Sequence, residues 1–151
     1  MRKILFILFA ALALVACEKE ENVSYEKCEL MPEILTLPAE KETTFTVRAS
    51  VPAFIFTCAY ESSDDPITNF AYSLRSFIPS SYPYVYDSKK HPLLDGVTRW
   101  EMFRDVYCIE QVDETTFKFT VKPPKGYDRI EFLFTPEGGL KYSNKLYVII
   151  K

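Results

Sequence analysis

Strict alternation of apolar and polar residues is the feature that most restricts the fold of this chain. In the segment Thr115–Lys122, the apolar residues Phe117, Phe119 and Val121 alternate with Thr and Lys. Thr43–Ala49 repeats this period of two. Successive side chains of a β-strand point to opposite faces, so each segment predicts a strand with one buried face.

Further segments have strand character and are separated by turn residues. They are Ile34–Leu37, Val51–Tyr60, Trp100–Phe103, Val106–Ile109, Arg129–Thr135 and Lys145–Ile150. Within Val51–Tyr60, alternation places Phe54 on the same face as Cys58 and Tyr60, and Ile55 on the other face. About seven strands joined by polar turns predict an all-β fold, an antiparallel β-sandwich over residues 30–151.

Residues 61–98 interrupt this pattern and are expected to form one long irregular insertion. Phe70, Leu74, Phe77 and Ile78 recur at helical spacing, which predicts one or two helical turns after Asn69. Four Pro and Gly residues break up the remainder of the segment. A long connection on a β-sandwich is often the place where its function lies.

The N-terminus has the pattern of an export leader. Positive charge at Arg2 and Lys3 precedes the uncharged run Ile4–Ala16, which is too short to span a bilayer. The run ends in Leu14-Val15-Ala16-Cys17, which resembles a bacterial lipobox. The resemblance implies that residues 1–16 are a signal peptide, that Cys17 is lipidated, and that residues 17–29 form an acidic tether.

This leader also predicts a location. The lipid anchor would hold the protein on the bacterial outer membrane, at its periplasmic face or at the cell surface. The residues Glu18-Lys19-Glu20-Glu21 resemble the acidic export signal of surface lipoproteins in Bacteroidetes. Without Arg2 and Lys3, the chain has 16 basic and 21 acidic residues, a net charge of −5. This negative charge argues against a nucleic-acid partner.

Three cysteines remain besides Cys17, namely Cys28, Cys58 and Cys108. An odd number leaves at least one thiol outside any disulfide. Cys58 and Cys108 lie in strand-like runs, where a buried reduced cysteine behaves as a small apolar residue. We therefore favour buried thiols, with a Cys58–Cys108 bridge as the alternative.

Several segments are similar to a known family. They are Leu35-Thr36-Leu37-Pro38-Ala39-Glu40 with Thr44-Phe45-Thr46-Val47, Trp100, Phe117-Lys118-Phe119-Thr120-Val121 with Asp128-Arg129-Ile130-Glu131-Phe132, and Tyr147-Val148-Ile149-Ile150. Together they resemble the BACON domain, an immunoglobulin-like β-sandwich module of Bacteroidetes surface proteins. The resemblance implies that fold and a role in carbohydrate binding or as a spacer. The family's Gly-Gly after the first strand is replaced by Lys41-Glu42.

The insertion contains the most suggestive candidate for a binding site. Tyr82, Tyr84 and Tyr86 follow a period of two and project to one side if the segment is extended. Tyrosine rings suit stacking on sugars or a protein hot spot. Asp87 and His91 would add hydrogen bonds, and Trp100 is a further aromatic candidate. The alternative is that these rings pack the insertion onto the sandwich.

Catalytic and metal-binding motifs are missing from the sequence. His91 is the only histidine, and neither a Cys-x-x-Cys pair nor a Gly-x-Ser-x-Gly motif occurs. We therefore expect a protein that is not an enzyme, without a catalytic residue, metal or cofactor. Its expected role is to bind a glycan or peptide through the aromatic loop; the alternative is a spacer or assembly subunit of an envelope complex.

Overall fold

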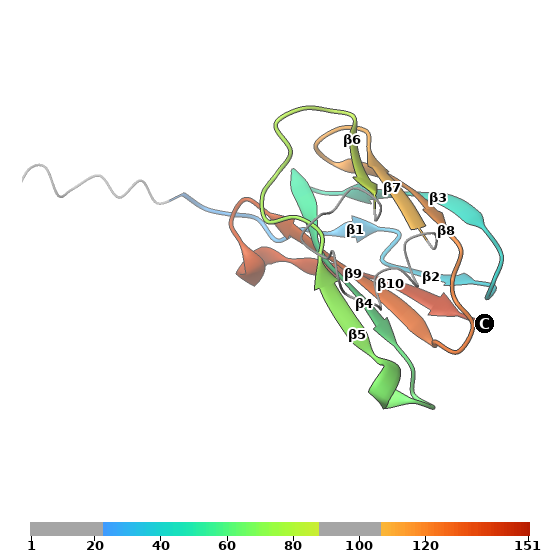
Figure 1. Cartoon of the computed structure of the whole chain (residues 1–151). Coiled ribbons are helices and arrows are strands. Elements are labelled where there is room, and N and C mark those ends of the chain that lie inside the picture. The colour runs from blue at the N-terminus through green and yellow to red at the C-terminus, as the bar shows by residue number, and fades with distance from the viewer. Residues whose placement is uncertain (1–22, 88–106) are drawn as a thin grey trace, which may run out of the picture.

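Two five-stranded sheets pack face to face in the computed structural model, which describes residues 23–87 and 107–151 (Figure 1). Sheet A contains, in spatial order, β1 (Leu30–Met31), β3 (Thr43–Ala49), β8 (Thr116–Val121), β7 (Tyr107–Gln111) and β6 (Tyr84–Asp87). Sheet B contains β2 (Ile34–Leu37), β10 (Asn144–Ile150), β9 (Arg129–Pro136), β4 (Ala53–Glu61) and β5 (Phe70–Ser73). The predicted all-β sandwich is confirmed.

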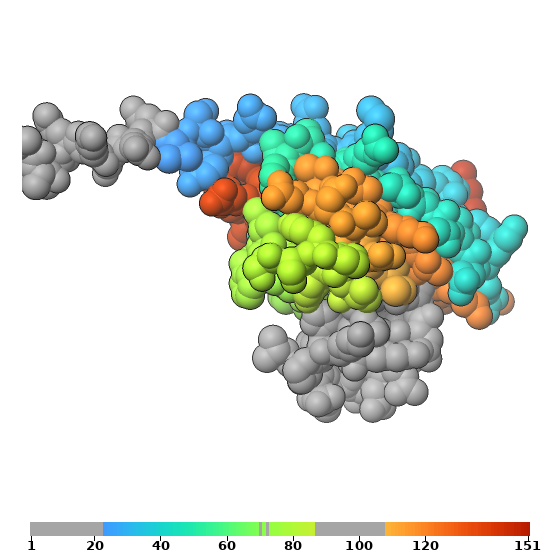
Figure 2. Space-filling view, turned by 90° about the horizontal axis from the view of Figure 1, so that it is seen from above, coloured from blue at the N-terminus to red at the C-terminus, as the bar shows by residue number. Residues whose placement is uncertain are grey.

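The strand order has the immunoglobulin-like pattern. The neighbours β1-β3-β8-β7 correspond to the four-stranded sheet of that fold, and β10-β9-β4 correspond to its opposing three strands. The chain adds β6 at the edge of sheet A and β5 at the edge of sheet B. The sequence predicts an antiparallel sandwich, but one pair of strands, β2 with β10, is parallel. Figure 2 shows β6, the β7–β8 hairpin and β3 side by side on one surface.

Within the segment 61–98, the described residues 61–87 are more regular than the sequence predicts. It contains β5, β6 and a short 3₁₀ turn, η1 (Pro66–Thr68). The helical turns expected after Asn69 are wrong, because Phe70 starts β5, which pairs with Thr57–Tyr60 of β4. The edge of β4 offers hydrogen bonds that a single isolated helical turn could not match.

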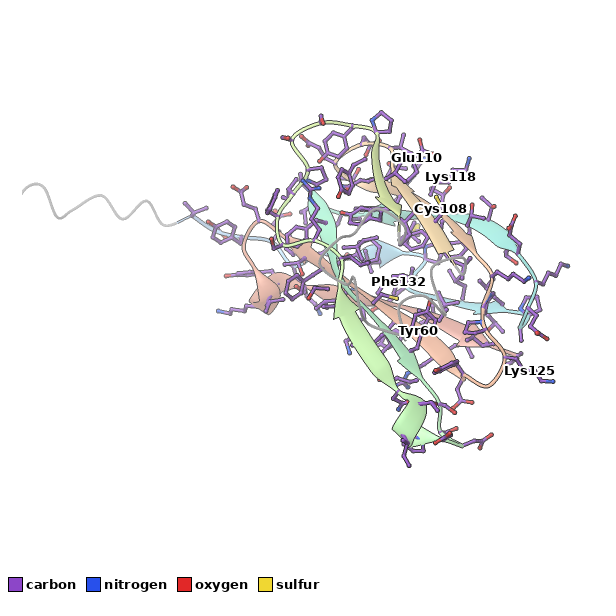
Figure 3. All side chains as sticks on the ribbon, viewed as in Figure 1. Tyr60, Cys108, Glu110, Lys118, Lys125 and Phe132 are labelled. Atoms are coloured by element: carbon purple, nitrogen blue, oxygen red, sulfur yellow. The ribbon has the colours of Figure 1, made fainter. Side chains whose placement is uncertain are left out.

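Aromatic rings fill the space between the sheets. The ring of Phe119, from β8, lies 5.1 Å from that of Phe132, from β9, and the Phe117 and Phe134 rings are 4.9 Å apart. Both pairs meet edge to face, the geometry that aromatic quadrupoles favour. The alternation predicted for Thr115–Lys122 is therefore confirmed, and in Figure 3 Phe132 lies between the two sheets.

A β-bulge changes which residues of β4 enter the core. The pairing of β4 with β9 shifts register between Ile55 and Thr57. Ile55 therefore lies in the core together with Cys58 and Tyr60, whereas Phe54 lies outside that cluster. The predicted grouping of Phe54 with Cys58 is wrong, because one extra residue in a strand reverses the faces on one side of it.

Hydrogen bonds from side chains of sheet A satisfy the backbone of β4 where β5 does not reach. The Tyr86 hydroxyl accepts a hydrogen bond from the Ile55 amide (3.1 Å) and donates one to Oε1 of Gln111 (2.9 Å). Nε2 of Gln111 donates to the Ala53 carbonyl (2.8 Å). Both side chains are 0% exposed. This buried network connects β6 and β7 of sheet A to the start of β4 in sheet B. The hydroxyl of Tyr86 and the side-chain amide of Gln111 both have hydrogen-bond partners, as buried polar groups require.

The described cysteines, Cys28, Cys58 and Cys108, are thiols, and Cys58 and Cys108 lie in different sheets. Cys58 is buried in sheet B, and Cys108 is exposed on sheet A because its neighbour Ile109 faces inward. The alternative Cys58–Cys108 bridge is therefore excluded, and the expectation that Cys108 is buried is wrong. Cys28 is fully buried, and burial, with the charge of Glu29, raises the pKa of its thiol to about 11.

Replacement of Tyr86 by Phe tests the buried network. Tyr86→Phe removes one hydroxyl and leaves the Ile55 amide and Gln111 Oε1 without that partner, so we expect the free energy of unfolding to fall by about 1–3 kcal/mol. Urea denaturation measures the change. Tyr84→Phe, in the same strand with a half-buried ring, is the control and should change stability by less than about 0.5 kcal/mol. Equal stability changes in the two variants would contradict the role of the network.

Candidate functional site

A groove opens at the end of the sandwich where β4 begins and β9 ends. Its volume is about 530 Å³, within the range of sites for small ligands. The groove-lining residues are Pro52, Phe54, Ser76, Phe77, Ile78, Glu114, Thr135, Pro136, Glu137 and Gly139. They come from the start of β4, the end of β9, the β3–β4 turn, the β5–β6 connection, the β7–β8 turn and the β9–β10 turn. Segments distant in the sequence therefore build one apolar surface with carboxylates at its rim.

The β-bulge supplies part of the wall of this groove. Because the register shifts after Ile55, Phe54 turns away from the central core cluster, although its side chain is only 6% exposed, and it pairs across the sheet with Thr135, which also lines the groove. Thr135 is held by a hydrogen bond from Ser143, whose Oγ lies 2.9 Å from its own. The Phe54 ring also meets the Phe56 ring edge to face at 6.2 Å. The wall is thus fixed by packing within sheet B.

The β5–β6 connection forms the opposite wall as it crosses from sheet B to sheet A, the green-to-yellow loop of Figure 1. Leu74 anchors its start, since its side chain is buried and its amide donates to the Phe56 carbonyl at 2.8 Å. Further along, the Phe77 side chain is 63% exposed on the groove. A large apolar side chain this exposed is typical of a contact surface.

Arg75 holds this wall in place. Its guanidinium carbon lies 4.6 Å from the centre of the Phe77 ring and 4.1 Å from the centre of the Tyr84 ring. Its Nε also donates to the Phe77 carbonyl at 2.8 Å. Cation–π contacts of this kind contribute about 0.5–1 kcal/mol at exposed sites. Arg75 therefore connects the groove to Tyr84, the tyrosine on which the sequence prediction centred.

The hydroxyl group of Tyr82, in the same region, has a raised pKa. Its hydroxyl oxygen is buried and has no hydrogen-bond partner within the described structure. Burial raises the pKa of this hydroxyl, and the negative charge of Glu114 raises it further, whereas Arg75 acts in the opposite direction. The carboxylate of Glu114 is thus close enough to Tyr82 to act on it, which links the aromatic loop to the acidic rim.

A second hollow of about 220 Å³ continues the groove toward the N-terminal segment. It shares Pro52, Pro136 and Glu137 with the groove and is also lined by Tyr25. Tyr25 packs against Gly138 so closely that a Cβ there would lie 2.6 Å from Tyr25 Cβ. The two hollows form one elongated depression at the end of the sandwich where the N-terminal segment enters.

The structure gives the predicted tyrosines different environments. Tyr84 and Tyr86 share one side of β6, as expected, and their rings meet edge to face at 4.9 Å. That side is the interior for Tyr86, which is 0% exposed and therefore has no surface for stacking on a ligand. Tyr86 is a core residue, the alternative considered above. Tyr82 and Tyr84 are half-buried, and neither lines the groove.

The remaining predicted site residues are Cys17, Asp87, His91 and Trp100. Cys17, His91 and Trp100 lie outside the described residues. For Asp87 the structure gives the backbone, which pairs with Cys108 at the edge of sheet A. Sequence analysis missed the groove residues, although Phe77 was noted as part of an apolar pattern. The signal available in the sequence was an aromatic residue, Phe77, two positions after a cationic one, Arg75.

Other charged clusters in the described segments have structural explanations. Glu131 is only 6% exposed, and its carboxylate forms ion pairs with Arg129 (2.9 Å) and Lys145 (2.7 Å). The hydrogen bond to Glu131 raises the pKa of the Lys145 ammonium group. The carboxylate of Asp128 accepts hydrogen bonds from the hydroxyl and amide of Ser63, which lower its pKa. On sheet A, Glu110 and Lys118 face each other on neighbouring strands (Figure 3).

Comparison with known proteins adds no family or function. No protein-family model matches the chain, and no curated protein matches it either. Among residues 23–87 and 107–151, no three His, Cys, Asp or Glu side chains cluster as metal ligands. The same residues include no helix of the length and apolar character needed to cross a membrane.

Replacement of Arg75 tests how the groove wall is held. Arg75→Gln removes the charge over the Phe77 and Tyr84 rings, so we expect the free energy of unfolding to fall by about 1 kcal/mol. Chemical denaturation measures this change. Arg48→Gln, at an exposed position of β3, is the control with the same change of charge. Equal effects in both variants would show that the loss of net charge, not the stacking, is responsible.

Proposed function

We propose that this protein is a lipid-anchored lipoprotein of the bacterial envelope whose non-catalytic β-sandwich binds a glycan or peptide ligand. The observation that carries the binding role is the elongated groove with the exposed Phe77 beside it. Exposed aromatic and apolar side chains in a hollow with few polar groups are typical of ligand sites. The resemblance to BACON-like modules is in keeping with this role.

The site differs from the one expected from the tyrosine pattern. Tyr84 acts through Arg75, which supports the wall carrying Phe77, and Tyr86 supports the sandwich itself. The aromatic loop thus has a positioning role, and the contact surface is formed by residues on either side of it. The fold supplies a rigid frame, since four turns meet at the groove and each starts or ends in a paired strand.

The anchor proposed at Cys17 would place this groove near the membrane. The chain from Cys17 to Tyr25 is eight residues long, and an extended chain spans at most about 3.6 Å per residue. The Tyr25 ring packs against Tyr142, and the Cys28 amide donates to the Tyr142 carbonyl, so this segment enters beside the β9–β10 turn. Tyr25, which lines the second hollow, would therefore lie within about 30 Å of the proposed lipidation site.

Substitution at Cys17 tests the anchor. Cys17→Ser removes the sulfur that accepts the acyl chains, so we expect it to abolish metabolic labelling by a palmitate analogue and to release the protein from the membrane fraction. The natural chain should be labelled in the same cells. Equal labelling of the two proteins, or of neither, would contradict the lipoprotein assignment.

Substitution at Phe77 tests the binding role. Screening on glycan and peptide arrays should identify a ligand, and Phe77→Ala should weaken its binding roughly tenfold, as expected from the loss of one buried aromatic contact. Leu140→Ala, at a similarly exposed apolar residue outside the groove, should leave affinity unchanged.

Three results would contradict this proposal. Binding that survives Phe77→Ala would move the site elsewhere on the molecule. A complete lack of ligands, with stable copurification of an envelope protein through another surface, would favour the alternative, a spacer or assembly subunit. Hydrolysis of any arrayed ligand would contradict the non-catalytic assignment.

A further inference from the structure

The groove carries negative charge that nothing in the described structure neutralises. Among the described residues that line the groove, Glu114 and Glu137 are the charged ones, and both are exposed. Neither forms an ion pair within the described part of the chain. The guanidinium group of Arg75, in the β5–β6 connection, is held over the Phe77 and Tyr84 rings. A ligand with a positive charge would therefore complete an unbalanced site.

The surface between the two glutamates is apolar. Pro52, Phe54, Phe77, Ile78 and Pro136 make up most of it. Neutral sugars need several polar partners around their hydroxyl groups, and these residues offer none from their side chains. Acidic glycans and phosphorylated ligands would meet repulsion from the carboxylates. Apolar side chains of a ligand would instead exclude water from this surface.

The depression is also elongated rather than round. The groove and the second hollow meet at Pro52, Pro136 and Glu137 and together extend from Phe77 to Tyr25. An extended chain of several residues fits such a shape better than a compact small molecule does. Prolines on both sides of the junction keep the shape fixed, because their rings restrict the backbone. A preformed surface of this kind lowers the entropy cost of binding.

From charge, polarity and shape together, we propose that the groove binds an extended peptide segment in which Lys or Arg residues alternate with apolar residues. The cationic groups would lie at Glu114 and Glu137, and the apolar side chains would pack on the exposed ring of Phe77. This inference rests on the proposed binding role and names its ligand class.

Two fluorescent peptides of equal length test the proposal by anisotropy. One alternates Lys and Leu, and the other alternates Glu and Leu. The mature protein should bind the Lys–Leu peptide at least roughly tenfold more tightly than the Glu–Leu peptide, because opposite charges attract across the rim and like charges repel. Added salt should reduce this preference, since the carboxylates are exposed and are screened by ions.

Paired substitutions of glutamates locate the charge effect. Glu114→Gln with Glu137→Gln should weaken binding of the Lys–Leu peptide roughly tenfold, as two exposed ion pairs would. Glu33→Gln with Glu42→Gln changes the net charge equally at exposed positions outside the groove and should have no effect. Both double variants keep the side-chain shape, and circular dichroism verifies that they remain folded.

Three results would overturn the peptide proposal. The first is equal binding of the two peptides, and the second is an equal effect of the two double variants. The third is capture of a neutral oligosaccharide that depends on Phe77, with no affinity for the Lys–Leu peptide. That third result would leave the proposed binding role intact, whereas loss of all Phe77-dependent binding would remove both.

Discussion

A buried tyrosine hydroxyl completes the hydrogen bonding of a strand in the opposite sheet, and the rest of the structure depends on this link. The backbone of β4 at Ala53–Ile55 lies beyond the reach of β5, which pairs only with Thr57–Tyr60. Tyr86 and Gln111 from sheet A provide the missing partners, and the Glu114 carbonyl accepts from the Ala53 amide at 3.1 Å. An unsatisfied amide at this buried position would cost about 1–3 kcal/mol.

The same few residues determine where the groove forms. The bulge that follows Ile55 keeps Ile55 in the core and leaves Phe54 on the groove. The link through Gln111 and Glu114 fixes the β7–β8 turn beside the start of β4, which brings the carboxylate of Glu114 to the rim. The core and the groove are therefore parts of one arrangement, in which the bulge of β4 turns Phe54 from the central cluster toward the groove wall.

The sequence predicted the regular part of this fold well, because alternation reports directly on which strand face is buried. Thr43–Ala49 and Ile34–Leu37 match β3 and β2 in full, and the predicted immunoglobulin-like sandwich is observed. The bulge was invisible, since Phe54 and Ile55 are both apolar and either could face the core. The short edge strand β5 was missed because its four residues show no strand pattern of their own. They adopt the strand conformation by pairing with β4.

The site was predicted only in part for a related reason. The tyrosines at positions 84 and 86 do share one side of an extended strand, but period alone does not say whether that side faces solvent or the core. The groove is assembled from four turns that are distant in sequence, so no local pattern contains it. Glu114 and Glu137, from two different turns, are likewise brought to one groove only by the fold.

Amide hydrogen exchange at Ile55 tests the central link most directly. If the Tyr86 hydroxyl holds this amide, its exchange in the folded protein should be nearly as slow as that of Phe119, in the centre of sheet A. In Tyr86→Phe the Ile55 amide should exchange much faster while Phe119 remains protected under conditions where the variant is folded. Rapid exchange at Ile55 in the natural chain, or no change in the variant, would contradict the account.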